Sequence, residues 1–310
     1  MSCKIPTICY YKLNRYNKTA VERKVISMQN IKIFAFADEA SGTVDGQITA
    51  MKRNSLDGVE LRGTELGNVS DLSFVAACLI RQKLNDAGLK VWSLGSPMGK
   101  IGIGDDFAHH LEKFRSTLEI SKVLGAENIR MFSFYVPKGK EDDYRNAVID
   151  RMGKFVEMAA SYDVTLCHEN EKGIYGENAE RCLDLLKTFP TLKGVFDPAN
   201  FVQCGVDTLS AWEMLKPYIK YMHIKDALAD GRVVPAGAGI GNVAKITEEF
   251  IAMGGREFTI EPHLTVFKGL AELEREGEKS KVGDYAYPDS DSAFDAACNA
   301  FKGILKGINS

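Results

Sequence analysis

The sequence reads VTLCHEN at residues 164–170, GVFDPAN at 194–200, YMHIKD at 221–226 and FTIEPH at 258–263. Each of these four stretches is an apolar run that ends in a side chain able to bind a metal ion. The four side chains are those of Glu169, Asp197, His223 and Glu261. Because four successive runs end in this way, we expect four neighbouring strand ends to converge on one point. Three carboxylates and one imidazole at one point repel each other unless a divalent cation neutralises them.

The chain before these runs repeats the same alternation of apolar runs and helical patterns. Four earlier runs have the composition of buried parallel strands. They are IKIFAFA at 31–37, GVEL at 58–61, KVWSL at 90–94 and NIRMFSF at 128–134. The starts of the eight runs lie roughly 27 to 38 residues apart, which is the size of one βα unit. Eight such units predict an α/β protein, a single (β/α)8 TIM barrel.

An open, doubly wound sheet is the alternative to a barrel. Such sheets usually carry a glycine-rich, phosphate-binding turn after the first strand. Here the first run is followed by DEASG at 38–42, which is not a turn of that kind. We therefore favour the closed barrel.

The composition narrows the class of protein. The 310 residues are 45% hydrophobic, enough to bury one large core. A net charge of −3 offers no basic surface for nucleic acid, and no apolar run approaches the roughly 18 residues of a membrane helix. Seven scattered cysteines, none in C-x-x-C spacing, indicate thiols in a reducing compartment. We therefore predict a cytoplasmic protein without disulfides.

The first 27 residues differ in composition from the rest of the chain. They hold six basic residues against Glu22 alone, and they lack the apolar segment of a secretory signal. Met28 lies just before the first predicted strand. We predict that residues 1–27 are an extension, disordered or not part of the natural protein, and that residues 28–310 form the catalytic barrel.

Further side chains near the predicted strand ends are candidate substrate contacts. Lys225 shares strand parity with His223 and so could point into the site, although a solvated loop lysine has the same sequence signature. Glu60 and Trp92 could form the far wall, or could belong to the core. His263 follows Glu261 by two residues and could also line the site.

The motifs HEN, FDPANF, HIKD and TIEPH resemble those of the sugar phosphate isomerase/epimerase family, the xylose isomerase-like TIM barrels. The resemblance in layout runs from about Met28 to the end of the chain. It implies that one divalent ion is bound by Glu169, Asp197, His223 and Glu261, and that the two glutamates exchange the substrate proton. The oxygen and nitrogen ligands suit Mn²⁺ or Mg²⁺, with Co²⁺ and Zn²⁺ as further candidates.

The function that this resemblance implies is a metal-dependent isomerase or epimerase of a small carbohydrate or sugar phosphate. A proton beside a ketone is removed by a carboxylate only if the charge of the resulting enediolate is stabilised, which a bound metal does. Reprotonation on the opposite face gives an epimer, whereas protonation of the neighbouring carbon gives an aldose–ketose isomer. Both outcomes remain open at this point.

Departures from the family pattern shift the expected substrate. Ketose 3-epimerases of this family carry a histidine where Asn200 stands and an arginine where Ala229 stands. Both residues usually hold substrate oxygens, so a free-sugar 3-epimerase is less favoured, and Asn200 becomes a candidate substrate contact. The HxKD motif is similar to that of the inositol-catabolic branch, which makes an inosose-type dehydratase the alternative function.

Two other classes of function are less consistent with the sequence. An abasic-site endonuclease of this fold needs a three-metal site with more histidines, but the chain has five and carries Asn200 where one is needed. A barrel that binds a sugar acid without turnover would not need two glutamates placed for proton exchange.

Two loops complete the expectations. The glycine-rich segment VPAGAGIGN, ending at Asn242, could bind a phosphate through its backbone amides. The charged stretch 268–291 is long for a loop and could cover the site or contact a second subunit, so a homo-oligomer is possible.

Overall fold

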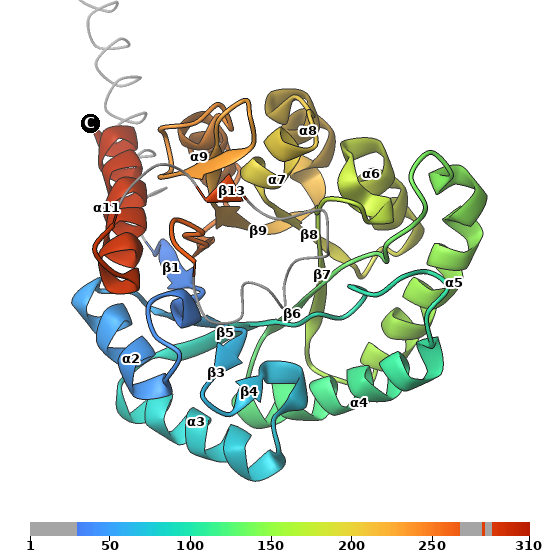
Figure 1. Cartoon of the computed structure of the whole chain (residues 1–310), viewed down its shortest axis with the longest axis horizontal. Coiled ribbons are helices and arrows are strands. Elements are labelled where there is room, and N and C mark those ends of the chain that lie inside the picture. The colour runs from blue at the N-terminus through green and yellow to red at the C-terminus, as the bar shows by residue number, and fades with distance from the viewer. Residues whose placement is uncertain (1–29, 267–280, 283–286) are drawn as a thin grey trace, which may run out of the picture.

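The computed structural model describes residues 30–266, 281–282 and 287–310. Eight parallel strands close into a barrel, and helices surround it (Figure 1). The strands are β1 (Lys32–Ala35), β2 (Gly58–Leu61), β5 (Lys90–Gly95), β6 (Asn128–Met131), β7 (Thr165–Glu169), β8 (Lys193–Phe196), β9 (Ile219–Ile224) and β12 (Glu257–Ile260). The predicted (β/α)8 barrel is therefore confirmed, with each apolar run of the sequence supplying one strand. The extension predicted at residues 1–27 lies outside the described residues.

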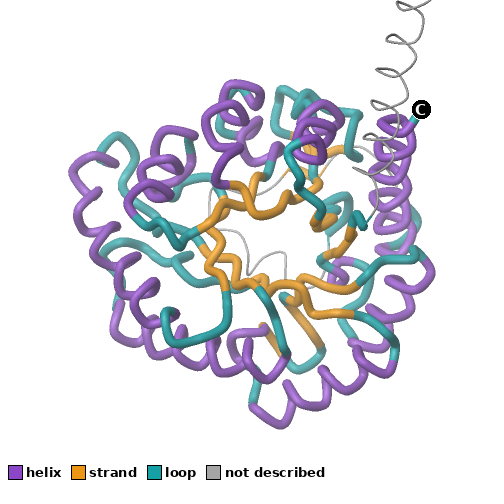
Figure 2. Tube along the Cα trace, turned by 180° about the vertical axis from the view of Figure 1, so that it is seen from behind, coloured by secondary structure: helices purple, strands orange, loops and turns teal. Residues whose placement is uncertain are grey.

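Helices cover the outside of the barrel, as seen from the opposite side in Figure 2. The α-helices are α2 (Val44–Arg53), α3 (Phe74–Asp86), α4 (Phe107–Leu124), α5 (Glu141–Ala159), α6 (Ala179–Thr188), α7 (Pro198–Gln203), α8 (Thr208–Leu215), α9 (Val243–Ala252) and α11 (Ser290–Asn309). Short 3-10 helices are η1 (Ala37–Glu39), η2 (Val69–Asp71), η3 (Tyr175–Glu177) and η4 (Lys216–Tyr218). Among the described residues, none of these helices is long and apolar enough to cross a bilayer.

Two small sheets lie outside the barrel and were not predicted from the sequence. One is a hairpin of β3 (Gly63–Thr64) and β4 (Gly67–Asn68). The other joins β10 (Asp226–Ala227), β11 (Arg232–Val234) and β13 (Lys281–Val282). Strands of two or three residues are too short to produce a recognisable apolar alternation, which explains why the sequence pattern missed them. The second sheet brings part of the charged stretch 268–291 beside the chain that follows β9, whereas residues 267–280 and 283–286 lie outside the described part.

Side-chain caps define where many helices begin. The side chains of Thr43, Ser73, Asp106, Asn178 and Asp207 each accept a hydrogen bond from a backbone amide in the first turn of the following helix. Such caps satisfy amide donors that have no partner within the helix. The strand-to-helix loops are thereby held at the carboxyl end of the barrel, which is the end where the predicted site lies.

The core of the described residues has one large apolar cluster and two small ones, of which one consists of Ala199, Val202 and Ala227. The larger apolar cluster fills the space between the strands and the surrounding helices. A smaller cluster lies inside the barrel and consists of Phe34, Trp92, Cys167, Val195 and Tyr221. The rings of Phe34 and Trp92 stack with their centroids 5.0 Å apart. This inner cluster forms an apolar floor beneath the polar residues at the carboxyl ends of the strands.

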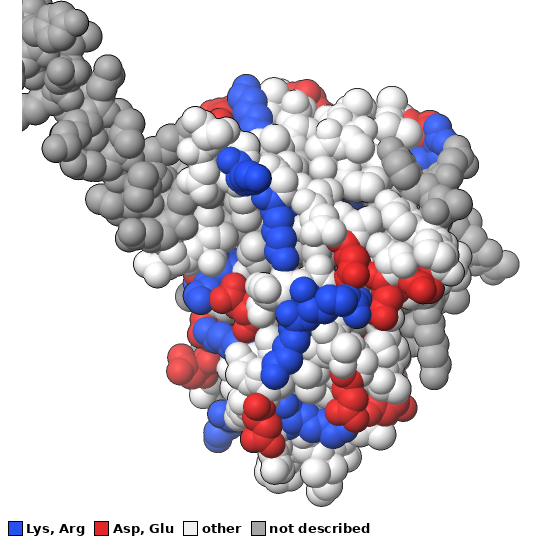
Figure 3. Space-filling view, turned by 90° about the vertical axis from the view of Figure 1, so that its left-hand side faces the viewer, with Lys and Arg blue, Asp and Glu red and all other residues white. Residues whose placement is uncertain are grey.

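The last helix completes the ring of helices. Helix α11 lies beside α2, and Arg53 of α2 forms ion pairs with Asp291 and Asp295 of α11 at 2.9 and 3.0 Å. Acidic and basic side chains lie interspersed over the face that carries these helices (Figure 3). The C-terminal segment is thus tied to the first βα unit.

Strand β2 contains an irregularity that matters for the site. The register between β2 and β5 shifts after Val59, so that Glu60 pairs with Ser93 and its side chain faces the barrel interior. Just before the shift, a Cβ on Gly58 would lie 2.0 Å from the carbonyl oxygen of Lys90. Glycine at this position therefore allows the two strands to approach.

We expect Gly58→Ala to destabilise the barrel because its Cβ would force these two strands apart. Overpacking of this kind costs about 1–3 kcal/mol in the free energy of unfolding. Chemical denaturation measures the change. The matched control is Gly104→Ala, whose Cβ would meet no atom within 4 Å. Equal stability of the two variants would contradict this explanation.

Candidate metal centre

The carboxyl ends of four neighbouring strands bring together the four side chains that the sequence singled out. Glu169 ends β7, Asp197 follows β8, His223 lies in β9, and Glu261 follows β12. One possible ligand atom from each lies within 4.8 Å of those of the others, and all four side chains are buried. The convergence expected from the sequence is therefore present in the structure.

Asp197 is held in place by the neighbouring strand end. Its Oδ1 caps α7 by accepting a hydrogen bond from the amide of Asn200 at 2.9 Å. The side chain of Asn170, next to Glu169, binds the backbone of Asp197 through both its donor and its acceptor, at 2.9 and 3.0 Å. Asp197 is thus both a helix cap and a member of the cluster, with Oδ2 left for the centre.

His223 lies between two carboxylates. Its Nδ1 is 3.0 Å from Oε1 of Glu169, and its Nε2 is 3.2 Å from Oε2 of Glu60. Burial alone would lower the pKa of His223, but the carboxylates of Glu169 and Glu60 raise it well above its usual value. Glu60 also accepts a hydrogen bond from Tyr221 Oη at 2.9 Å. An Nε2–H donated to Glu60 leaves Nδ1 as the ring nitrogen that faces the cluster.

Glu60 therefore lies behind His223, whereas the sequence left it open between the far wall of the site and the core. The β2 irregularity turns its side chain toward the barrel axis, and the inner cluster beneath it provides Tyr221. A carboxylate that accepts a hydrogen bond from a ligating histidine fixes the orientation and tautomer of the ring.

Two arginines that the sequence pattern missed pair with Glu169 and Glu261, each through the carboxylate oxygen that faces away from the centre of the cluster. Arg130 Nε lies 3.2 Å from Oε2 of Glu169, and Arg62 Nη1 lies 3.4 Å from Oε1 of Glu261. Both guanidinium groups also lie over the ring of Phe36. Arg62 is further fixed by Asp38 and Glu39, at 2.9 Å each. Alternation along the NIRM strand places Arg130 on the same side as Asn128, so it could have indicated that Arg130 points into the barrel. Nothing in the sequence distinguishes Arg62 from the other basic residues.

Lys225 points into the cluster, as its strand parity suggests. Its Nζ lies 2.9 Å from Oε2 of Glu261 and 3.0 Å from Oδ2 of Asp197. Burial, together with the charges of Glu261 and Glu169, still raises the pKa of Asp197 to about 7, although Lys225 opposes the shift. Three carboxylates of the cluster, those of Glu169, Asp197 and Glu261, thus lie around the one ammonium group of Lys225.

These observations fit a divalent cation. Asp197 Oδ2 is buried, and it pairs with the ammonium group of Lys225 at 3.0 Å without the geometry of a hydrogen bond. A buried carboxylate oxygen ordinarily has hydrogen-bond donors as well as a counter-charge. The donor atoms are three carboxylates and an imidazole, with no thiolate, which is a ligand set for Mg²⁺, Mn²⁺ or a similar ion. Glu169, Asp197, His223 and Glu261 could hold such an ion.

Two further candidate substrate contacts, Asn200 and His263, lie at the edge of the carboxylate cluster. Asn200 donates from Nδ2 to Oε1 of Glu169 at 3.3 Å and to the carbonyl oxygen of Asn170 at 2.9 Å. His263 Nδ1 lies 3.0 Å from Oε1 of Glu39, and its backbone adopts a left-handed φ of 45°. Both residues border the cluster.

Trp92 lies away from the cluster, in the floor of the barrel. It stacks on Phe34, and the ammonium group of Lys90, the first residue of β5, lies over its ring. The sequence left Trp92 open between the wall of the site and the core, and the structure places it in the inner cluster of the core. The depth of a side chain along the barrel depends on strand register, which the sequence does not specify.

The glycine-rich loop after β11 has a partner within the chain. The carboxylate of Asp226 accepts hydrogen bonds from the amides of Gly237, Gly239 and Gly241 at 2.9, 3.1 and 2.9 Å. A Cβ on Gly239 would lie 2.3 Å from Asp226 Oδ1, so the close approach requires glycine. The amides that the sequence pattern assigned to a phosphate are therefore used by Asp226.

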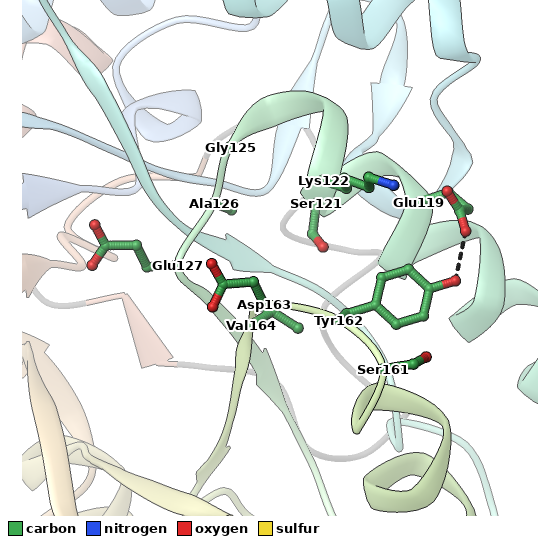
Figure 4. Close-up of a pocket in the computed structure, with 10 residues that line it drawn as sticks. All are labelled: Glu119, Ser121, Lys122, Gly125, Ala126, Glu127, Ser161, Tyr162, Asp163 and Val164. Carbon is green, nitrogen blue, oxygen red and sulfur yellow. Dashed lines mark hydrogen bonds between the residues drawn. The ribbon is translucent and has the colours of Figure 1, made fainter.

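A cavity of about 640 Å³ lies at the other end of the barrel (Figure 4). Its lining comes from the end of α4, from residues 125–127 before β6 and from residues 161–164 before β7. Two of the lining residues are joined by a hydrogen bond, which Tyr162 donates to Glu119 at 2.5 Å. Because the cavity lies at the amino ends of β6 and β7, it is separate from the carboxylate cluster.

The comparisons with known proteins agree with this architecture. The model of the family described as xylose isomerase-like TIM barrel matches residues 48–276. A curated relative, 3-dehydroshikimate dehydratase from Bacillus anthracis, is 22% identical over 178 residues, which cover 56% of this chain. The match spans 62% of the length of that relative.

Two solved structures illustrate the range of similar folds. D-allulose 3-epimerase from Methylomonas sp., in complex with D-allulose, matches with a TM-score of 0.68 at 16% identity, covering 89% of this chain and 97% of the other. The IOLI protein, with a zinc atom bound, matches with a TM-score of 0.68 at 13% identity, covering 89% and 99%. At these identities the likeness shows the fold alone.

We expect Glu60→Gln to weaken the binding of Mn²⁺ by about 10–100-fold, the usual effect of losing a carboxylate behind a ligating histidine. Calorimetric titration of the purified protein measures the dissociation constant. The control is Asp38→Asn, which also removes a buried negative charge but pairs with Arg62 rather than His223. Equal losses in both variants would show that charge alone, and not the orientation of His223, is responsible.

Proposed function

The chain belongs to the xylose isomerase-like TIM barrel family, and from this premise we propose that it is a divalent-metal-dependent isomerase or epimerase. Its proposed substrate is a small sugar or sugar phosphate. The observation that supports this proposal is the convergence of Glu169, Asp197, His223 and Glu261 at the carboxyl end of the barrel. In barrels of this architecture, that end carries the catalytic residues.

The metal-binding part of the proposal assigns one donor atom to each of the four side chains. Those atoms are Glu169 Oε1, Asp197 Oδ2, His223 Nδ1 and Glu261 Oε2, which the neighbouring contacts leave directed at the centre. A divalent ion held there supplies Lewis-acid stabilisation of negative charge on substrate oxygens. Mn²⁺ and Mg²⁺ are the proposed ions, with Co²⁺ and Zn²⁺ as further possibilities.

Glu169 and Glu261 are the proposed proton-transfer groups. They come from β7 and β12, which are separated in the barrel by β8 and β9, so they approach the centre from different directions. Burial raises the pKa of Glu261, but Lys225, His263 and His223 together lower it well below its usual value. An ionised carboxylate held in a fixed orientation is suited to act as a base.

The proposed step is the transfer of a proton from a substrate carbon beside a carbonyl to one of these carboxylates. The electron pair of the C–H bond moves toward the carbonyl, and its oxygen takes up the charge. Return of a proton to the opposite face inverts the carbon, whereas protonation of the neighbouring carbon exchanges aldose and ketose. Lys225 and Asn200, which border the cluster, are the proposed contacts to substrate oxygens.

A dehydratase is the second candidate function. The curated relative from Bacillus anthracis carries that activity in its name, and dehydration begins with the same removal of a proton beside a carbonyl. The two candidates differ in the next step, because a dehydratase expels a hydroxyl group as water from the adjacent carbon.

Deuterium uptake tests the proposal. We expect the Mn²⁺-loaded protein in D₂O to exchange one carbon-bound proton of its substrate, within a panel of ketoses, their phosphates, inososes and 3-dehydroshikimate. NMR follows the exchange and also detects an alkene if water is lost. Glu169→Gln and Glu261→Gln should each reduce the rate by about 10²-fold or more.

The matched control for these variants is Glu127→Gln, a carboxylate near the cavity at the opposite end of the barrel. Unchanged exchange in both active-site variants would refute the proposed roles of the glutamates. Loss of water would select the dehydratase over the isomerase.

A further inference from the structure

Lys225 contacts two of the proposed metal ligands, a position that a role in substrate binding alone does not explain. The residue directly follows β9, and its side chain is 6% exposed. Its ammonium group lies 2.9 Å from Glu261 and 3.0 Å from Asp197, both of which are proposed metal ligands. A positive charge of the protein therefore lies against two donor groups of the metal site.

The contacts of each carboxylate show which oxygens are involved. Oδ1 of Asp197 accepts the amide of Asn200, and Oε1 of Glu261 lies near Arg62 and His263. The second oxygen of each carboxylate, Oδ2 and Oε2 respectively, faces the centre, and these are the two oxygens that Lys225 contacts. A divalent ion bound at the centre would use the same two atoms.

We propose that Lys225 competes with the divalent ion for Asp197 and Glu261, and that it thereby sets the metal affinity of the site. The proposal rests on the metal binding described under the proposed function. Two cations on shared oxygens repel one another strongly in a buried site. Ion binding is then coupled to the movement of the Lys225 ammonium group away from at least one carboxylate.

The type of side chain suits this role. Lysine carries a compact charge on a flexible stem, whereas arginine is a planar group that forms several hydrogen bonds in one orientation. Arg62 is held by Asp38 and Glu39 on its far side and cannot leave without breaking those pairs. The ion pairs of Lys225 are with Asp197 and Glu261, so its movement breaks no further ion pair that the structure shows.

A further carboxylate, that of Glu171, interacts electrostatically with Lys225. Burial lowers the pKa of Lys225, but the charges of Asp197, Glu261, Glu169 and Glu171 together raise it above its usual value. Glu171 follows Glu169 by two residues, is largely buried, and pairs with Lys100 at 3.0 Å. It provides a place where the ammonium group of Lys225 remains neutralised after it leaves Asp197 and Glu261.

The test compares the affinity for Mn²⁺ of the wild-type chain and of Lys225→Met, both stripped of metal with a chelator. Competition with a fluorescent chelator gives the dissociation constants. We expect Lys225→Met to bind Mn²⁺ at least tenfold more tightly and to unfold at a lower temperature when metal is removed. The second effect is expected because the carboxylates then lack their counter-charge.

The matched control is Lys113→Met, which removes a partly buried lysine that pairs with Asp71 and with no proposed ligand. Its affinity for Mn²⁺ should stay within about threefold of the wild type. If the affinity of the control variant for Mn²⁺ rose as much as that of Lys225→Met, the cause would be general repulsion between positive charges, and the proposed competition would be overturned. Unchanged or weaker binding by Lys225→Met would also overturn it.

A second variant keeps the test decisive if Lys225→Met does not fold. Lys225→Gln retains a polar side chain but removes the charge, and it should bind Mn²⁺ more tightly than the wild type for the same reason. Affinity equal to that of the wild type in a folded Lys225→Gln would overturn the proposal. Failure of the wild-type protein itself to bind Mn²⁺ would instead refute the metal-dependent function, so the two failures are distinguishable.

Discussion

Neutralisation of buried negative charge is the constraint on which the arrangement of the site depends. Among the described residues, seven carboxylates are buried around the carboxyl end of the barrel; they are Asp38, Glu39, Glu60, Glu169, Asp197, Asp226 and Glu261. Burial of an unpaired charge is costly, so each carboxylate needs a cation or hydrogen-bond donors. Arg62, Arg130, His223 and Lys225 provide part of this charge, and a divalent ion would provide the rest.

The fold positions these charged groups through the aromatic floor of the barrel, the irregularity in β2 and the side chain of Asn170. The aromatic floor of the barrel places Tyr221 under Glu60, and the irregularity in β2 turns Glu60 toward His223. Asn170 ties the ends of β7 and β8, so that Glu169 and Asp197 keep a fixed separation. Rigid support of this kind is necessary for a proton-transfer site, because the base must remain aligned with the substrate carbon.

The sequence predicted the barrel and the convergence of the four side chains because both arise from regular patterns. Parallel strands buried on both faces appear as apolar runs, and their carboxyl ends meet at one end of the barrel. Other features depend on details that such patterns do not contain. The depth of Trp92 depends on strand register, and the selection of Arg62 as the partner of Glu261 depends on tertiary contacts. The backbone amides near Gly239 do bind an anionic group, as the glycine-rich sequence suggests, but that group is the carboxylate of Asp226 and not a phosphate.

The central claim is that the four strand-end side chains form a single metal centre. Anomalous scattering from crystals of the Mn²⁺-loaded protein, recorded at the manganese absorption edge, tests it most directly. We expect one strong peak with donor atoms of Glu169, Asp197, His223 and Glu261 at about 2 to 2.5 Å. A loaded crystal with no peak among these residues, or with its peak at another site, would contradict the account.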